Sequence, residues 1–125
     1  RSGCTSRARF RAAMDCRAEC PAYQTMGASN RWVYESLALR RRVLSPRACR
    51  RVQVPVLVCS AGRDTQVGLR EQRLLAARLP QGRLLEFPDE KHELYNAGNA
   101  GLAAFLGAVL DFFGLTAGYG KEETK

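Results

Sequence analysis

The sequence predicts a mixed α/β protein in which a parallel sheet is flanked by helices. An unbroken apolar and β-branched run of about six residues, within VPVLVCSAGRD, is typical of a strand covered on both faces. A second short apolar run follows at residues 83–87, and a helical pattern separates the two. Strands joined through a helix pair in parallel by a right-handed crossover.

The first helix is expected over residues 5–19. A capping residue at its start precedes Phe10, Ala13, Met14 and Arg17, which recur at helical spacing. The segment CPAYQTMGAS then breaks the pattern.

The second helix is expected to begin with Ser29 or Asn30 as N-cap and to end before the pair Ser45-Pro46. It runs through RWVYESLALRRRVL, and one face of the helix is shared by Trp32, Val33, Ser36, Leu37 and Arg40.

A third helix, LREQRLLAARLP, joins the two strands and stops at Pro80, and a last helix spans Asn99 to Phe113 with Gly114 closing it. The polar tail after that helix is expected to be disordered. In the third helix, Leu69, Leu74, Leu75 and Leu79 are predicted to point inward and Arg70, Arg73 and Arg78 outward.

Two parallel strands leave unpaired edges and small faces, so we expect further strands from elsewhere in the protein. The start at Arg1, without methionine or a signal-peptide pattern, also indicates part of a longer or processed chain. We therefore expect the carboxyl-terminal part of a larger α/β domain.

Composition narrows the function classes. The longest apolar run, AGLAAFLGAVLDFFGL, is interrupted by glycines and Asp111 and is shorter than the roughly 20 residues of a membrane span. Five cysteines are an odd number and are best read as reduced thiols. The pair Cys16 and Cys20 lacks a second pair of ligands, so no zinc site is expected.

The candidate catalytic residues each follow a predicted strand. Asp64 comes just after the first strand, and His92, the single histidine, lies in the loop PDEKHELYNAG after the second. Loops beyond the carboxyl ends of parallel strands carry ligand and catalytic groups. Because neighbouring strands would bring these loops together, the Asp64 carboxylate is expected to bind one imidazole nitrogen while the other faces a reacting group.

This arrangement resembles a known family. The segments CTSRARF, NRWVYESLALRRRVL, PVLVCSAGRDTQV, KHELYNAG and VLDFFG are similar to the carboxyl-terminal part of bacterial lysophospholipase and monoacylglycerol lipase type serine hydrolases, in the α/β-hydrolase superfamily. The resemblance covers about residues 4 to 114. It implies the end of a helical cap at 1–46, a carboxyl-terminal hydrolase core at 47–114, and a tail at 115–125.

The resemblance implies that Asp64 is the acid and His92 the base of a catalytic triad. It also makes Trp32, Leu94 and Tyr95 substrate-lining residues, although plain packing explains these three equally well. The chain has no G-x-S-x-G nucleophile elbow, so the serine and the oxyanion hole are expected upstream and this chain alone should be inactive. Asp89, Glu90 and Lys91 stand where the family usually has a small residue before the histidine.

The resemblance implies a monoacyl lipid ester as substrate and no metal or organic cofactor. The implied location is the cytoplasm or the periphery of the inner membrane. Ser60 ends a strand but lacks the surrounding elbow pattern, so packing is the better account of it. The rival hypothesis is a non-catalytic, Arg-rich module that binds nucleic acid or an acidic partner, based on the run Arg40 to Arg42 with Arg47, Arg50 and Arg51. No nucleic-acid-binding motif accompanies this run, so specific nucleic-acid binding is not expected.

Overall fold

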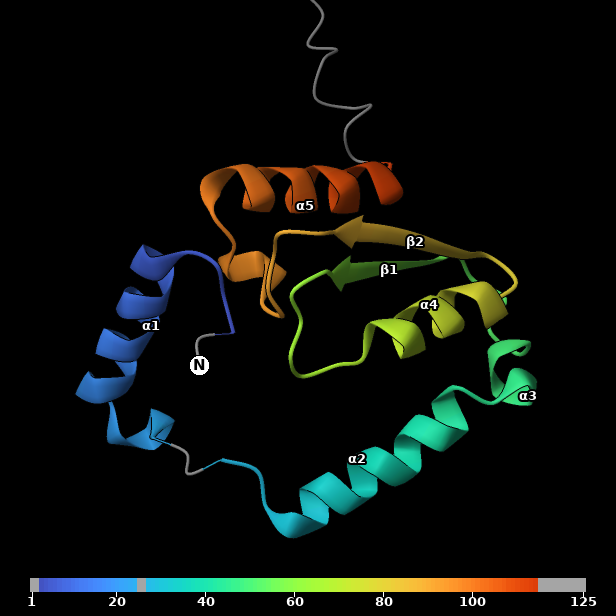
Figure 1. Ribbon diagram of the computed structural model, residues 1–125, viewed down its shortest axis with the longest axis horizontal. Coiled ribbons are helices and arrows are strands. Elements are labelled where there is room, and N and C mark those ends of the chain that lie inside the picture. The colour runs from blue at the N-terminus through green and yellow to red at the C-terminus, as the bar shows by residue number, and fades with distance from the viewer. Residues whose placement is uncertain (1–2, 25–26, 115–125) are drawn as a thin grey trace, which may run out of the picture.

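The computed structural model describes residues 3–24 and 27–114, and in this part helices surround a two-stranded parallel sheet (Figure 1). The predicted mixed α/β class is confirmed at this level. The tail predicted to be disordered lies outside the described residues. The elements in chain order are α1 (Arg7–Glu19), the 3-10 turn η1 (Pro21–Tyr23), α2 (Asn30–Val43), α3 (Pro46–Cys49), β1 (Val56–Ala61), α4 (Leu69–Arg78), β2 (Gly82–Phe87), the 3-10 turn η2 (Leu94–Asn96) and α5 (Asn99–Phe112).

Side-chain caps fix where the first helices begin. The Ser6 hydroxyl accepts a hydrogen bond from the backbone N–H of Arg9 at 3.3 Å, and that of Ser29 accepts one from Trp32 at 3.1 Å. Of the two N-caps predicted for α2, Ser29 and Asn30, the structure has Ser29, and α1 likewise begins directly after a serine cap. Gly114, with φ of 69°, follows α5 in the left-handed conformation that favours glycine.

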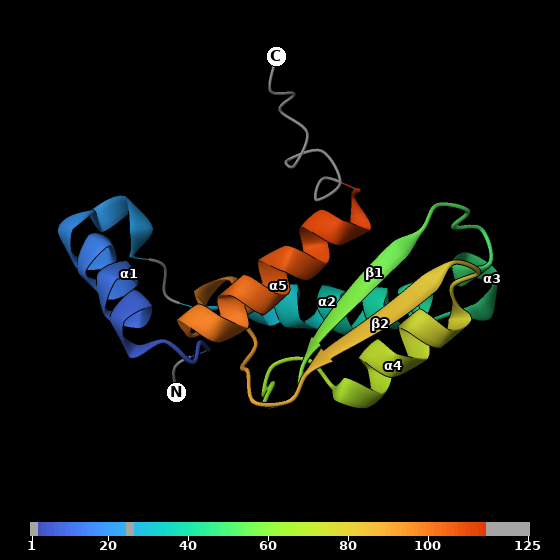
Figure 2. The same cartoon turned by 90° about the horizontal axis from the view of Figure 1, so that it is seen from above.

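The sheet is the predicted β1-α4-β2 unit. Val56 of β1 pairs with Gly82 of β2, and the parallel register continues to Ala61 opposite Phe87. α4 packs on one face of the sheet and α5 on the other (Figures 1 and 2). In the described part of the chain each strand has a single partner, so one edge of each is open.

The core lies on the α5 side, at the carboxyl ends of the strands. Alternate residues of the two strands point to this face, where Ala61 and Phe87 pack with Leu94. The Phe87 ring meets the ring of Phe105 from α5 edge to face, with centroids 6.1 Å apart. This packing holds the two strand ends together beneath the loops that follow them.

The prediction for α4 was wrong at two positions, Leu74 and Arg78. Leu74 is 36% exposed, whereas Ala76 is the buried residue of this helix. The small Ala76 side chain allows α4 to lie close to the sheet, since its carbonyl comes near Gly82 at the start of β2. Arg78, predicted to point outward, instead donates a hydrogen bond to the Leu44 carbonyl.

Much of the apolar surface of α2 is uncovered. Trp32 is 63% exposed and Leu37 57%, and α2 is tied to α4 by an ion pair between Arg40 and Glu71 at 3.1 Å. No described helix is both long and apolar enough to cross a lipid bilayer.

Candidate functional site: an aspartate–histidine pair at the strand ends

Backbone hydrogen bonds join the two loops that leave the sheet. The Gly62 N–H donates to the Phe87 carbonyl at 2.8 Å, and the Arg63 N–H donates to the Glu90 carbonyl at 2.9 Å. Gly62 is needed at this crossing because a Cβ there would lie 2.4 Å from the Pro88 carbonyl oxygen. The parallel ladder thus continues beyond the strands and sets the two loops side by side.

Asp64 is held by three hydrogen bonds. Its Oδ1 accepts from the backbone N–H groups of Gln66 at 2.7 Å and Val67 at 3.0 Å, which is the local turn that an aspartate forms with its own backbone. Its Oδ2 lies 2.9 Å from Nδ1 of His92. The sequence-based expectation that this carboxylate reaches an imidazole nitrogen is therefore met.

The electrostatics of the pair favour an ionised aspartate. The Asp64 side chain is only 4% exposed, and this burial raises the pKa of the carboxyl. The hydrogen bonds from His92, Val67 and Gln66 outweigh burial, so the pKa of Asp64 is below its usual value. A carboxylate in this state accepts hydrogen bonds and donates none.

The protonation of the imidazole follows from that of the carboxylate. Since Asp64 accepts only, Nδ1 of His92 must carry the hydrogen, and in the neutral ring Nε2 is then the bare nitrogen. No hydrogen bond from the described residues reaches Nε2. The His92 side chain is 36% exposed, so the bare nitrogen is available to a group outside the chain.

Hydrogen bonds join the amino-terminal segment to the histidine loop and form a brace for it. This brace was not predicted from the sequence. The Glu93 N–H donates to the Gly3 carbonyl at 2.9 Å, and the Lys91 N–H donates to the Thr5 hydroxyl at 3.3 Å. Arg9 of α1 extends the brace, since its guanidinium donates to the carbonyl of Ala97. No local pattern in residues 3–9 signals these contacts, because their partners lie more than 80 residues away.

The charged residues before the histidine have separate roles. Asp89 is exposed, whereas Glu90 is partly buried, its backbone bonds to both Arg63 and Phe87, and its Oε2 has no partner among the described residues. The backbone of Glu90 therefore shapes the loop that carries His92.

The three predicted substrate-lining residues lie in different places. Leu94 is 6% exposed and belongs to the core with Ala61 and Phe87. Tyr95, in η2, is 62% exposed, and Trp32 lies on α2.

Trp32 lines a groove that begins beside the Asp64 turn. The groove has a volume of about 480 Å³ and runs between α2 and α4. Gln66 and Val67, which bind Asp64 through their N–H groups, are part of its wall. Its other walls are mainly apolar and include Val33, Leu37, Val43, Leu44 and Leu75.

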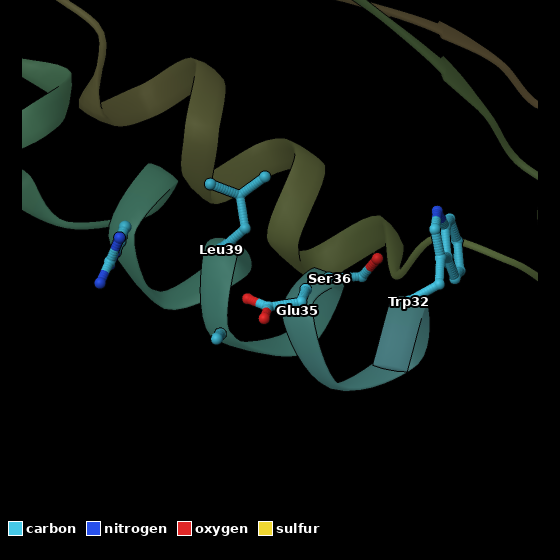
Figure 3. A pocket seen from close by; sticks show the side chains of 6 residues that line it. Trp32, Glu35, Ser36 and Leu39 are labelled. Atoms are coloured by element: carbon cyan, nitrogen blue, oxygen red, sulfur yellow. The ribbon is translucent and has the colours of Figure 1, made fainter. Parts of the chain in front are cut away.

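A second hollow lies along α2 and is lined only by residues of that helix, among them Trp32, Glu35, Ser36 and Leu39 (Figure 3). A surface formed by one helix cannot enclose a ligand, and no residue of the turn that holds Asp64 contributes to it. We do not place the site there.

Other reactive groups are arranged less favourably. Ser60 is fully buried in the sheet, and its hydroxyl has no partner among the described residues. None of the five cysteines, all of which lie in the described residues, forms a disulfide with another. Within residues 3–24 and 27–114, no three His, Cys, Asp or Glu side chains are arranged to hold a metal ion.

Comparisons of the chain with protein-family models, with curated proteins and with solved structures find no match. The site therefore stands on its own geometry.

Proposed function

We propose that this chain supplies the acid and the base of a serine ester hydrolase with the α/β-hydrolase architecture. The observation that carries the proposal is the 2.9 Å contact between Asp64 Oδ2 and His92 Nδ1 at the carboxyl ends of adjacent parallel strands. A buried, ionised carboxylate that orients an imidazole with one open nitrogen is the arrangement from which a hydroxyl nucleophile is activated.

In the proposed reaction, His92 Nε2 takes the proton of a serine hydroxyl as that oxygen attacks the ester carbonyl. The same proton then passes from Nε2 to the departing alcohol, and a water molecule repeats the sequence to release the acid. Asp64 remains ionised throughout, holds the ring in place, and stabilises the imidazolium.

The proposal requires a nucleophile and oxyanion donors from outside this chain. Ser60 is buried in the sheet, and the sequence contains no G-x-S-x-G elbow. The open edges of β1 and β2 offer backbone groups with which further strands could pair, and such strands would carry the missing groups to the same end of the sheet.

A monoacyl lipid ester suits the groove between α2 and α4. Its wall is mostly apolar, as an acyl chain requires, and it starts at the turn that holds Asp64. Trp32, at one end of the groove, is proposed to contact the acyl chain. The exposed Tyr95, three residues after His92, is proposed to contact the ester end, while Leu94 supports the loop from beneath.

The test uses the native protein, purified together with any polypeptide that is joined or bound to this chain. A fluorophosphonate probe should label a serine, and His92→Ala or Asp64→Asn should slow hydrolysis of a monoacylglycerol or lysophospholipid by about 10³-fold or more. Asp89→Asn is the matched control, because it removes an exposed carboxylate near the histidine that does not bond to it. Undiminished hydrolysis in His92→Ala would remove His92 from the mechanism.

A second measurement needs only the chain itself. Nitrogen-15 NMR at about pH 8, where an ordinary imidazole is neutral, should find the hydrogen of His92 on Nδ1. Asp64→Asn should lose this preference, and Asp89→Asn should keep it. A hydrogen on Nε2 in the unmodified chain would contradict the proposed roles.

A further inference from the structure

Positive charge is concentrated in the middle of the chain. Residues 36–63 contain no Asp or Glu, and they contain much of the arginine that gives the chain its formal charge of +8. The arginines of this stretch are Arg40, Arg41, Arg42, Arg47, Arg50, Arg51 and Arg63.

Four of these arginines surround one hollow at the junction of α2 and α3. The hollow has a volume of about 380 Å³ and is lined by Arg41, Arg42, Arg47 and Arg51, with Ser45 and Ala48 between them. Among the described residues, no carboxylate lies within 4.0 Å of any of the four guanidinium groups. The neighbouring Arg40 differs, since it is paired with Glu71.

The backbone beneath the hollow is firmly held. The Ser45 hydroxyl accepts a hydrogen bond from the Ala48 N–H at 3.1 Å, and the Arg78 guanidinium ties the Leu44 carbonyl to α4. The buried Cys49 thiol donates to the Val43 carbonyl at 3.2 Å. The arginines therefore project from a fixed turn and not from a loose loop.

We propose that this hollow, the arginine hollow, binds a phosphate group. Four like charges around one space repel each other, and an anion placed among them relieves that repulsion. Guanidinium groups match phosphate oxygens in a bidentate geometry, and the Ser45 hydroxyl, whose oxygen already accepts from Ala48, keeps its hydrogen to donate. The ligand is a single phosphate-bearing group, carried by an anionic phospholipid or by a small soluble compound.

Two simpler accounts explain less. Basic residues near a helix carboxyl terminus complement the helix dipole, which accounts for Arg41 and Arg42 in the last turn of α2 but not for Arg47 and Arg51. Nucleic acid needs a longer track of contacts or stacking aromatics. The hollow is lined by no aromatic residue.

The arginine hollow is separate from the Asp64–His92 pair. α3 precedes β1 and lies beside the amino ends of the strands, whereas the pair lies at their carboxyl ends (Figures 1 and 2). Phosphate binding is thus a function additional to the proposed hydrolysis, and either can fail without the other.

The test compares two variants of equal net charge. Arg41→Gln with Arg47→Gln removes two charges from the hollow, while Arg7→Gln with Arg11→Gln removes two from the exposed surface of α1. Binding is measured by flotation with phosphatidylcholine vesicles with or without phosphatidic acid, and by NMR titration with inorganic pyrophosphate. Circular dichroism checks that both variants fold.

We expect binding to at least one probe, weakened about tenfold or more by the hollow variant and less than about threefold by the α1 variant. Binding to the acidic vesicles alone identifies a lipid headgroup as the source, and amide shifts at Ser45 and Ala48 with pyrophosphate alone identify a soluble compound. Equal losses in the two variants would show a general effect of net charge and overturn the proposal. Binding to neither probe, or tighter binding to an RNA oligonucleotide, would also overturn it.

Discussion

The crossing of the two strand-end loops at Gly62 gives the sharpest test of the site geometry. A Cβ at Gly62 would lie 2.4 Å from the carbonyl oxygen and 2.6 Å from the Cα of Pro88, whereas ordinary contacts begin at 3.4 Å. Both neighbouring atoms belong to the backbone and cannot rotate away. Gly62→Ala should therefore push the loops apart by about 1 Å, the difference between 3.4 and 2.4 Å.

Such a shift has two costs. Overpacking of this kind destabilises a protein by about 1–3 kcal/mol, and loss of the hydrogen bond from Gly62 to Phe87 adds about 1 kcal/mol. It would also stretch the 2.9 Å contact between Asp64 and His92 beyond hydrogen-bond range. We expect a fall in melting temperature of about 10 °C and loss of the Nδ1-protonated form of His92.

Gly107→Ala is the matched control, and it is expected to raise the melting temperature where Gly62→Ala lowers it. Gly107 lies inside α5, and a Cβ there meets nothing within 4 Å. Alanine in a helix interior is favoured over glycine by about 0.5–1 kcal/mol, so this variant should melt slightly higher. If Gly62→Ala melts like the unmodified protein and keeps the His92 tautomer, the described crossing of the loops is wrong.

Three further predictions concern single side chains. Because the pKa of Asp64 is lowered in the folded state, its ionised form contributes stability above its unfolded pKa of about 3.9, and this is lost as pH falls through the lower folded value. Asp64→Asn should therefore make the loss of stability below about pH 5 shallower, and an unchanged pH dependence in this range would contradict the shift. Ser60→Ala removes a buried hydroxyl without a partner among the described residues, so urea unfolding should show a gain of about 1 kcal/mol, and a loss would reveal an unseen partner. Burial raises the pKa of the Cys59 thiol, so maleimide should label it at pH 7 more slowly than the exposed Cys16, as peptide mass spectrometry can measure.

Local signals in the sequence were enough to predict most of the elements. Serine caps mark the starts of α1 and α2, and the continuous apolar run of β1 needs no knowledge of its partner. The parallel pairing follows from the intervening helix, and the meeting of Asp64 with His92 follows from the pairing. Each step depends only on neighbours along the chain or on a general rule for sheets.

The missed features depend on distant contacts or on very short elements. α3 has only four residues, too few to show a helical period, although Pro46 at its start is a favourable first residue. The brace from Gly3 to Glu93 joins segments that have no shared pattern. The exposure of Leu74 follows from how close α4 lies to the sheet, which its leucine spacing alone does not reveal.

The brace also bears on the order in which the site assembles during folding. Asp64 and His92 are separated by 28 residues along the chain, whereas the Thr5 contact with Lys91 spans 86. Closing the longer loop costs about 1 kcal/mol more in chain entropy, so the pair should form first and the amino-terminal segment should dock last. A tag or fusion placed directly before Gly3 would then act on a late step, loosening the histidine loop while leaving the sheet intact.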